Sequence, residues 1–173
     1  MRILFDTNVV LDVLLDRKPH SESAAALLTH VERRRIEVLL AATTVTTIHY
    51  VAAKAVGASR ARKLLQGLLS LFEVAPVDGK VLAAAMSLGL PDLEDAVLHE
   101  AARHAGATAI VTRDPRGFAR SKLPVHAPRE LLDMFETIAE GLSDAEAGRV
   151  VDHDKVAKWL ASWGSDRERK PPR

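Results

Sequence analysis

The stretch ILFDTN at residues 3–8 decides the fold of this chain. A short apolar run ends at an acid, and apolar residues at helical spacing follow at once over residues 9–14. This pattern is typical of a buried strand that opens into a helix, and it places the Asp6 side chain at the carboxyl edge of a sheet. Open α/β folds bind their ligands at that edge, so Asp6 is a candidate site residue.

Two further acidic segments, PDLED at residues 91–95 and IVTRD at residues 110–114, occupy comparable places. Each has a structural interpretation by itself, because an acid before a helix is a good N-cap and Asp-Pro is typical of a turn. Their joint occurrence at predicted sheet edges favours a site. Carboxylates gathered from distant parts of one chain predict a site for a hard divalent cation.

Short apolar runs alternate with helical patterns along the chain, which indicates βαβ units and a mostly parallel sheet covered by helices on both faces. Prolines fall between the elements, as expected of residues that interrupt them. We expect strands at 2–5, 37–40, 73–75, 109–111 and Val125, and helices near 8–15, 21–34, 44–55, 58–70, 79–88, 92–105 and 128–138.

Composition excludes several classes of protein. The 173 residues suffice for one domain with a small appendage, and no apolar run reaches the roughly 18 residues of a membrane span. Cysteine is absent, which excludes disulfides and thiolate zinc sites and fits a cytoplasmic protein. Asp6 comes too early for a secretory signal. The net charge of +1 gives no global basic excess that would indicate nucleic-acid binding.

Four strings resemble, in the right order, the PIN-domain family of nucleases, and most of all the bacterial toxins of VapBC-type toxin–antitoxin pairs. The resemblance implies a three-layer α/β domain with an acidic cleft that binds Mg²⁺ or Mn²⁺. It further implies an endoribonuclease that hydrolyses RNA, and a homodimer as in many relatives. The strings are ILFDTNVVLDVLLDR (3–17), LPDLEDAVLHEAA (90–102), AIVTRDPRGF (109–118) and LPVHAPRELL (123–132).

The resemblance assigns roles to individual residues. Asp6, Asp95 and Asp114 match the acids that hold the metal and carry out catalysis, and Asp92 matches an additional acid found in a subgroup. Small polar residues beside them match positions that orient the carboxylates or hold metal-bound water. These supporting residues are Thr7, Asn8 and Thr112.

One departure from the family concerns the helix predicted near residues 44–55. Relatives usually place a Glu at its start, whereas TTVTTIHY at residues 43–50 has no carboxylate. The number of metal ions, one or two, is therefore left open.

A catalytically weak PIN-fold binding module is the first alternative to the nuclease. An aspartyl-phosphate phosphatase is a second, although Asn8 occupies the place of the second acid which that chemistry needs.

Basic residues just after the last acidic segment are candidates for contacts with RNA phosphates, whose binding would depend on salt. The basic run at residues 33–35 is better explained as a solvated helix end. The candidate RNA contacts are Arg113, Arg116, Arg120 and Lys122.

Residues 136–173 form a tail beyond the nuclease-like domain of residues 1–135. Trp159 and Trp163 lie four apart on an amphipathic helical segment and are candidate anchors for a groove. The tail resembles the toxin-binding segment of small bacterial antitoxins. This resemblance implies that the nuclease is inhibited by its own tail, in cis or across a dimer, or that it binds a cognate antitoxin. A helix that only completes the core or a dimer is the alternative. The candidate inhibitory residues are Arg149, Arg167 and Arg169.

Overall fold

The computed structural model describes residues 1–148, 151, 153–162 and 170 of the chain. The chain divides into two compact units, residues 1–133 and residues 134–173. Among the described residues, no helix combines the length and the apolar character needed to cross a bilayer.

Five parallel strands form one sheet in the order β3-β2-β1-β4-β5. In register, Ile3 of β1 lies opposite Val38 of β2 on one side and Ala109 of β4 on the other. The three central strands are almost wholly buried, as expected of parallel strands with helices on both faces. The strands are β1 (Arg2–Phe5), β2 (Glu37–Ala41), β3 (Glu73–Ala75), β4 (Ala109–Val111) and β5 (Val125–His126).

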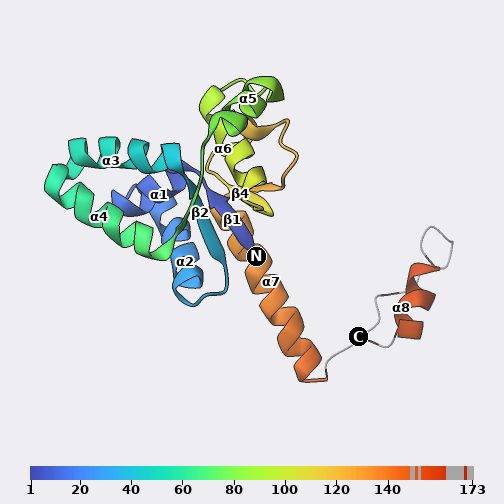
Figure 1. The fold of residues 1–173 in the computed structure, drawn as a ribbon. Helices are drawn as coiled ribbons and strands as arrows, with labels where there is room; N and C mark the ends of the chain where they lie inside the picture. Colours follow the sequence, from blue (N-terminus) through green and yellow to red (C-terminus); the bar gives the residue numbers. More distant parts are fainter. Residues whose placement is uncertain (149–150, 152, 163–169, 171–173) are drawn as a thin grey trace. The chain divides into compact units, whose positions relative to one another are not determined.

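Helices cover the sheet in two layers (Figure 1). In the ribbon of Figure 1, α1 to α4 lie on one side of the strands, and α5 and α6 lie on the other. The helices are α1 (Thr7–Leu14), α2 (His20–Glu32), α3 (Ala42–Val56), α4 (Ala58–Leu71), α5 (Gly79–Leu88), α6 (Leu93–His104), the 3₁₀ helix η1 (Pro115–Phe118), α7 (Pro128–Glu146) and α8 (His153–Leu160).

Alternate residues of the central strands supply the two cores. Leu4, Leu39 and Ile110 face α5 and α6, where they pack in one buried cluster with the alanines of α6. Because successive strand residues point to opposite faces, Ile3 and Phe5 lie on the other side. There the Phe5 and Phe72 rings meet edge to face with their centroids 6.2 Å apart, a geometry that aromatic pairs prefer.

The predicted α/β architecture is confirmed, and every predicted strand is present. Helix ends agree within two residues except for the helix predicted at 128–138, which continues to Glu146. Sequence periodicity did not indicate η1, since four residues are too few to show a period. The predicted boundary after residue 135 falls inside α7, which begins in the first unit and continues in the second, so it stays a prediction.

The second unit contains the rest of α7 and the short helix α8. Trp159 lies in α8 and is half-buried. Two exposed apolar residues of α7, Ile138 and Leu142, lie four apart on one side of that helix. Four tail residues with predicted roles lie outside the described residues: Arg149, Trp163, Arg167 and Arg169.

Candidate functional site

The candidate site lies at the point in the sheet where the order in which successive strands are added reverses. The chain builds β1, β2 and β3 toward one edge, then returns to place β4 and β5 on the other side of β1. The carboxyl ends of β1 and β4 are therefore a topological switch point, where open α/β sheets form their ligand crevices. Asp6 follows β1 directly, and Thr112 follows β4. The Asp6 backbone N–H donates to the Val111 carbonyl at 2.9 Å, which keeps the two strand ends together.

Asp6 is buried and held by hydrogen bonds from two neighbours. The Thr112 hydroxyl donates to Asp6 Oδ2 at 2.6 Å, and Asn8 Nδ2 donates to the same oxygen at 2.5 Å. Asn8 Nδ2 also reaches Thr112 Oγ1 at 3.1 Å, so the three side chains form a closed ring. Burial raises the pKa of the Asp6 carboxyl above its ordinary value, and these hydrogen bonds partly oppose the rise.

The segment after β4 is fastened to α1 by two further contacts. The Arg113 backbone N–H donates to Asn8 Oδ1 at 3.0 Å. Its guanidinium donates to both carboxylate oxygens of Asp12, at 2.9 and 3.2 Å. The Asp12 side chain is only 2% exposed, so Arg113 neutralises a buried charge. Asp114 follows, and its own N–H is held by Thr112 Oγ1 at 3.0 Å.

The first turn of α6 supplies three more carboxylates. Asp92 caps the helix by accepting from the Glu94 N–H at 2.6 Å. Helix α6 runs back toward the amino end of β4, so its first turn lies at the carboxyl edge of the sheet. Asp95 and Glu94 therefore come within electrostatic range of Asp6.

The pKa values of two carboxyls at the site, Glu94 and Asp95, are raised by burial and by neighbouring carboxylates. Burial, and then the charges of Asp6, Asp92, Glu94 and Asp114, raise the pKa of Asp95 to about 6. Burial, followed by the Asp6 and Asp92 charges, likewise raises the pKa of Glu94. Carboxylates that repel each other in this way are typical of sites that receive a cation or that handle protons.

Glu94 is a site residue that sequence reasoning missed. The sequence placed it in the acidic segment at residues 91–95 and assigned site roles only to its neighbours Asp92 and Asp95. In the structure it faces Asp6 and the Thr7 hydroxyl. The start of α3, where relatives have a Glu, instead places the buried Thr44 hydroxyl 3.4 Å from that of Thr7. Glu94 thus adds a carboxylate to the acidic cluster, and the nearness of Thr7 to this acid could not be read from the sequence.

Gly117 in η1 leaves room for the Asp95 carboxylate. A Cβ atom built on Gly117 would overlap Asp95 Oδ2, at a separation closer than real carbon and oxygen atoms approach. The absence of a side chain at residue 117 therefore allows the close approach of η1 to α6. Gly117 occupies a position where the sequence resemblance leads one to expect another acid.

The residues at this edge have the chemistry of a magnesium or manganese site, because both ions prefer carboxylate oxygens. The mutual repulsion that raises the pKa of Asp95 also fits a site that a cation would relieve. Within the part of the chain that the structure describes, no three Asp, Glu or His side chains are yet arranged to hold an ion together.

The candidate RNA contacts have different surroundings. Arg113 is occupied with Asp12 and is a structural residue in this arrangement. The Arg116 side chain is 97% exposed and lies 3.7 Å from Asp114. The Arg120 guanidinium donates to the Gly89 carbonyl at 3.3 Å. Lys122 is exposed, and its backbone N–H donates to His99.

Replacing Arg113 with alanine should destabilise the first unit. The Asp12 carboxylate would then be buried without its partner, at a cost of about 2 kcal/mol. Thermal unfolding should show a midpoint lower by roughly 5 °C in a chain of this size. Arg116→Ala removes a charge from the same segment but no buried partner, so it should leave the midpoint unchanged. Equal midpoints for the two variants would refute this role of Arg113.

Replacing Gly117 with alanine should displace Asp95 without unfolding the domain. The new methyl group meets the end of a side chain rather than backbone, so Asp95 can turn away at little cost. We expect affinity for Mn²⁺, measured by calorimetry, to fall by roughly tenfold or more, because misplaced groups lose their function steeply. Gly67→Ala in α4 meets no atom within 4 Å and is the matched control. Unchanged Mn²⁺ binding in Gly117→Ala would count against this placement.

Comparison with known families divides the chain into two parts. Residues 2–116 match the PIN domain family. Residues 136–173 match the C-terminal domain of antitoxin RelB3. The orphan antitoxin ParD2 of Caulobacter vibrioides is 46% identical over 66 residues, which cover 38% of this chain and 59% of that protein. The chain thus spans less than two thirds of that relative.

Solved structures resemble the PIN-matched part. FitAcB from Neisseria gonorrhoeae is 25% identical, with a TM-score of 0.58 over 73% of this chain and 97% of that one. VapC20 of Mycobacterium tuberculosis, described as a toxin that cleaves the sarcin–ricin loop, is 13% identical, with a TM-score of 0.56 over 68% of this chain and 93% of that one. The identity to VapC20 shows a common fold alone.

Proposed function

Because this chain belongs to the PIN domain family and its structure resembles toxin PIN domains, we propose that it is a metal-dependent endoribonuclease of the toxin–antitoxin type. One observation supports the proposal most strongly. Carboxylates from three distant segments lie at the switch point of the sheet, where burial and then their charges raise the pKa of Asp95 to about 6. RNA as the substrate class is part of the proposal, and it rests on the resemblance of the sequence to toxin nucleases of the PIN family.

In this proposal Asp6, Asp95 and Asp114 hold one or two Mg²⁺ or Mn²⁺ ions, with Asp92 and Glu94 adding negative charge. The bound cation would supply an activated water and would neutralise the charge that develops on the phosphate oxygens. The protein's own part is to fix the carboxylates. Asn8 and Thr112 hold the Asp6 carboxylate in one orientation. These hydrogen bonds limit the reorganisation needed when the cation arrives.

The tail is proposed to inhibit the nuclease, either on its own chain or across a homodimer. Support comes from the match of residues 136–173 to an antitoxin C-terminal domain. Helix α8 presents Trp159 as a candidate anchor, and Trp163, Arg149, Arg167 and Arg169 remain predictions outside the described residues. A cognate antitoxin supplied by another chain, in the cytoplasm, is the other form of the same proposal.

A second candidate is a catalytically weak PIN-fold binding module. Two observations favour the binding module. The start of α3 has no acidic residue, and among the described residues no three potential ligands are grouped so that they could hold a metal ion. The phosphatase alternative loses support, because Asn8 donates to Asp6 and would hold that carboxylate rather than act as an acid beside it.

The test is cleavage of an RNA stem–loop by the full chain and by a chain ending at residue 135. Products with 5′-phosphate and 3′-hydroxyl ends, formed with Mg²⁺ or Mn²⁺ and suppressed by EDTA, would support the nuclease. Asp6→Asn in each form should remove the activity. If neither form cleaves RNA and neither is stabilised by Mn²⁺, the binding module replaces the nuclease.

A further inference from the structure

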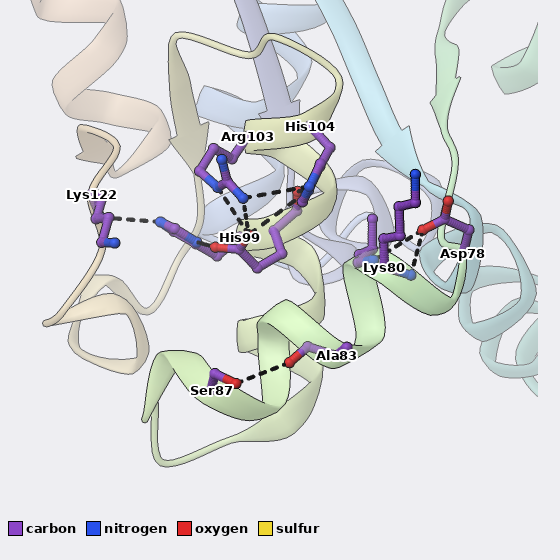
Figure 2. Close-up of polar contacts among 10 residues, drawn as sticks. Asp78, Lys80, Ala83, Ser87, His99, Arg103, His104 and Lys122 are labelled. Carbon is purple, nitrogen blue, oxygen red and sulfur yellow. Dashed lines mark hydrogen bonds and ion pairs between the residues drawn. The ribbon is translucent and has the colours of Figure 1, made fainter.

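A pocket of about 500 Å³ opens beside α6, away from the acidic cluster. Its lining includes Ser87 of α5, Glu100 and Arg103 of α6, and Arg120 and Lys122 of the segment after η1. Figure 2 shows Arg103 and Lys122 on either side of His99, with Ser87 on the neighbouring helix.

Two buried side chains, Glu100 and His99, contact the Arg103 guanidinium and the backbone of Lys122 at this pocket. Glu100 is 4% exposed, and its Oε2 accepts from Arg103 Nε at 2.9 Å. His99 is fully buried, and its Nδ1 lies 3.0 Å from Glu100 Oε1. The Lys122 backbone N–H donates to His99 Nε2 at 3.0 Å, so the proton of the neutral ring lies on Nδ1 and is donated to Glu100.

The protonation states leave the pocket positive. Burial lowers the pKa of His99, which therefore stays neutral. Burial by itself would raise the pKa of Glu100, but the hydrogen bonds from Arg103 and His99 and the charge of Arg103 together lower it, so Glu100 stays ionised. Three cationic side chains (Arg103, Arg120 and Lys122) and one carboxylate line the pocket, which gives a net charge of +2.

Helix α6 and the segment from η1 to Lys122 each contribute residues to both this pocket and the acidic cluster. Asp95, His99 and Arg103 recur every four residues along one side of α6, and eight residues of helix span roughly 12 Å. The segment that places Gly117 against Asp95 continues to Lys122, which is held by His99. The acidic cluster repels a polyanion until a cation binds, so a phosphodiester strand needs positive contacts nearby.

We propose that this pocket binds a backbone phosphate of the RNA, a short distance along the strand from the phosphate that lies at the acidic cluster. The inference rests on the proposed nuclease function and adds a substrate subsite to it. Arg103 is oriented by Glu100, Arg120 by the Gly89 carbonyl, and Lys122 through its backbone by His99. The two guanidinium groups, which are held by hydrogen bonds, lose less freedom when they bind an anion.

The experiment measures binding of a fluorescein-labelled RNA stem–loop to the full chain that carries Asp6→Asn, with Mg²⁺, at several salt concentrations. Arg120→Ala combined with Lys122→Ala should weaken binding by about tenfold. The slope of log affinity against log salt should fall by about 0.7 for each single-strand phosphate contact that is lost. Arg33→Ala combined with Arg35→Ala removes the same charge from an exposed helix end and is the matched control.

The outcomes separate this inference from the proposed function. If the parent chain cleaves RNA in an Asp6-dependent manner but the two double variants bind RNA equally, the pocket is not a phosphate subsite and the nuclease stands. If no form of the chain binds or cleaves RNA, both proposals are overturned. If polyglutamate binds the pocket and RNA does not, the pocket contacts an acidic protein segment, and the RNA subsite is again overturned.

Discussion

Asp95→Asn should reduce RNA cleavage by at least roughly hundredfold and, at neutral pH, stabilise the protein. The loss of activity follows because the variant removes a proposed metal ligand from the centre of the acidic cluster. The gain in stability follows because Asp95 is disfavoured in its charged form by burial and by Asp6, Asp92, Glu94 and Asp114. Asparagine has the same shape and no charge, so it escapes this repulsion.

The pH dependence of stability has a definite sign. The folded pKa of Asp95, about 6, lies above the ordinary value of 3.8. Well below pH 3.8 the Asp95 carboxyl is protonated in both the folded and the unfolded state, so it does not change the free energy of unfolding. As the pH rises from 3.8 through 6, the unfolded chain loses its proton first, so the folded state loses relative stability until both forms are ionised. The stability advantage of Asp95→Asn should therefore grow over this range and stay constant above it.

Thermal unfolding from pH 3.5 to pH 8 measures this effect, without Mg²⁺ and then with it. At pH 8 without Mg²⁺ we expect the midpoint of Asp95→Asn to be higher by roughly 2 °C, a modest figure because Asp95 is partly solvated. Added Mg²⁺ should stabilise the parent chain and not the variant. Glu32→Gln removes one negative charge from an exposed position at the end of α2 and serves as the control for a general loss of charge. A variant less stable than the parent at pH 8 would contradict the electrostatic account.

Removal of the tail should increase cleavage by roughly tenfold or more. A segment joined to the domain it inhibits acts at an effective concentration on the order of millimolar, so even weak inhibition in cis is nearly complete. A chain that ends at residue 135 should therefore cleave RNA faster than the full chain at equal concentration. A separate peptide of residues 136–173, added to the shortened chain, should restore inhibition in proportion to its concentration.

Point variants separate inhibition from a simple effect of length. Trp159→Ala in the full chain should raise cleavage part of the way toward the shortened chain, because it removes a candidate anchor of α8. Lys158→Ala changes the neighbouring exposed residue of the same helix and should have no effect. Equal cleavage rates for the full and shortened chains would refute inhibition by the tail, and the proposed nuclease function would still stand. Circular dichroism of the shortened chain would show whether the first unit keeps its fold.

Most of the local structure was predictable because it depends on spacing along the chain. Short apolar runs identified every strand, and the alternation of strands with helices predicted the parallel sheet. The helix that starts at Pro128 was underestimated in length. Its continuation past residue 138 is exposed and polar on most sides, and the sequence pattern there matches that of a helix end as well as that of a helix.

The sequence by itself determined which acids stand at strand and helix ends, because each such position depends only on residues a few places away. It placed Asp6 after β1, Asp92 and Asp95 at the start of α6, and Asp114 after β4. Only the tertiary structure decided that β1 and β4 are neighbours and that Glu94 lies near Asp6 and Thr7. The same holds for the pairing of Arg113 with Asp12 across about a hundred residues of chain. These contacts depend on strand order and side-chain direction, which arise when distant segments pack and not from local periodicity.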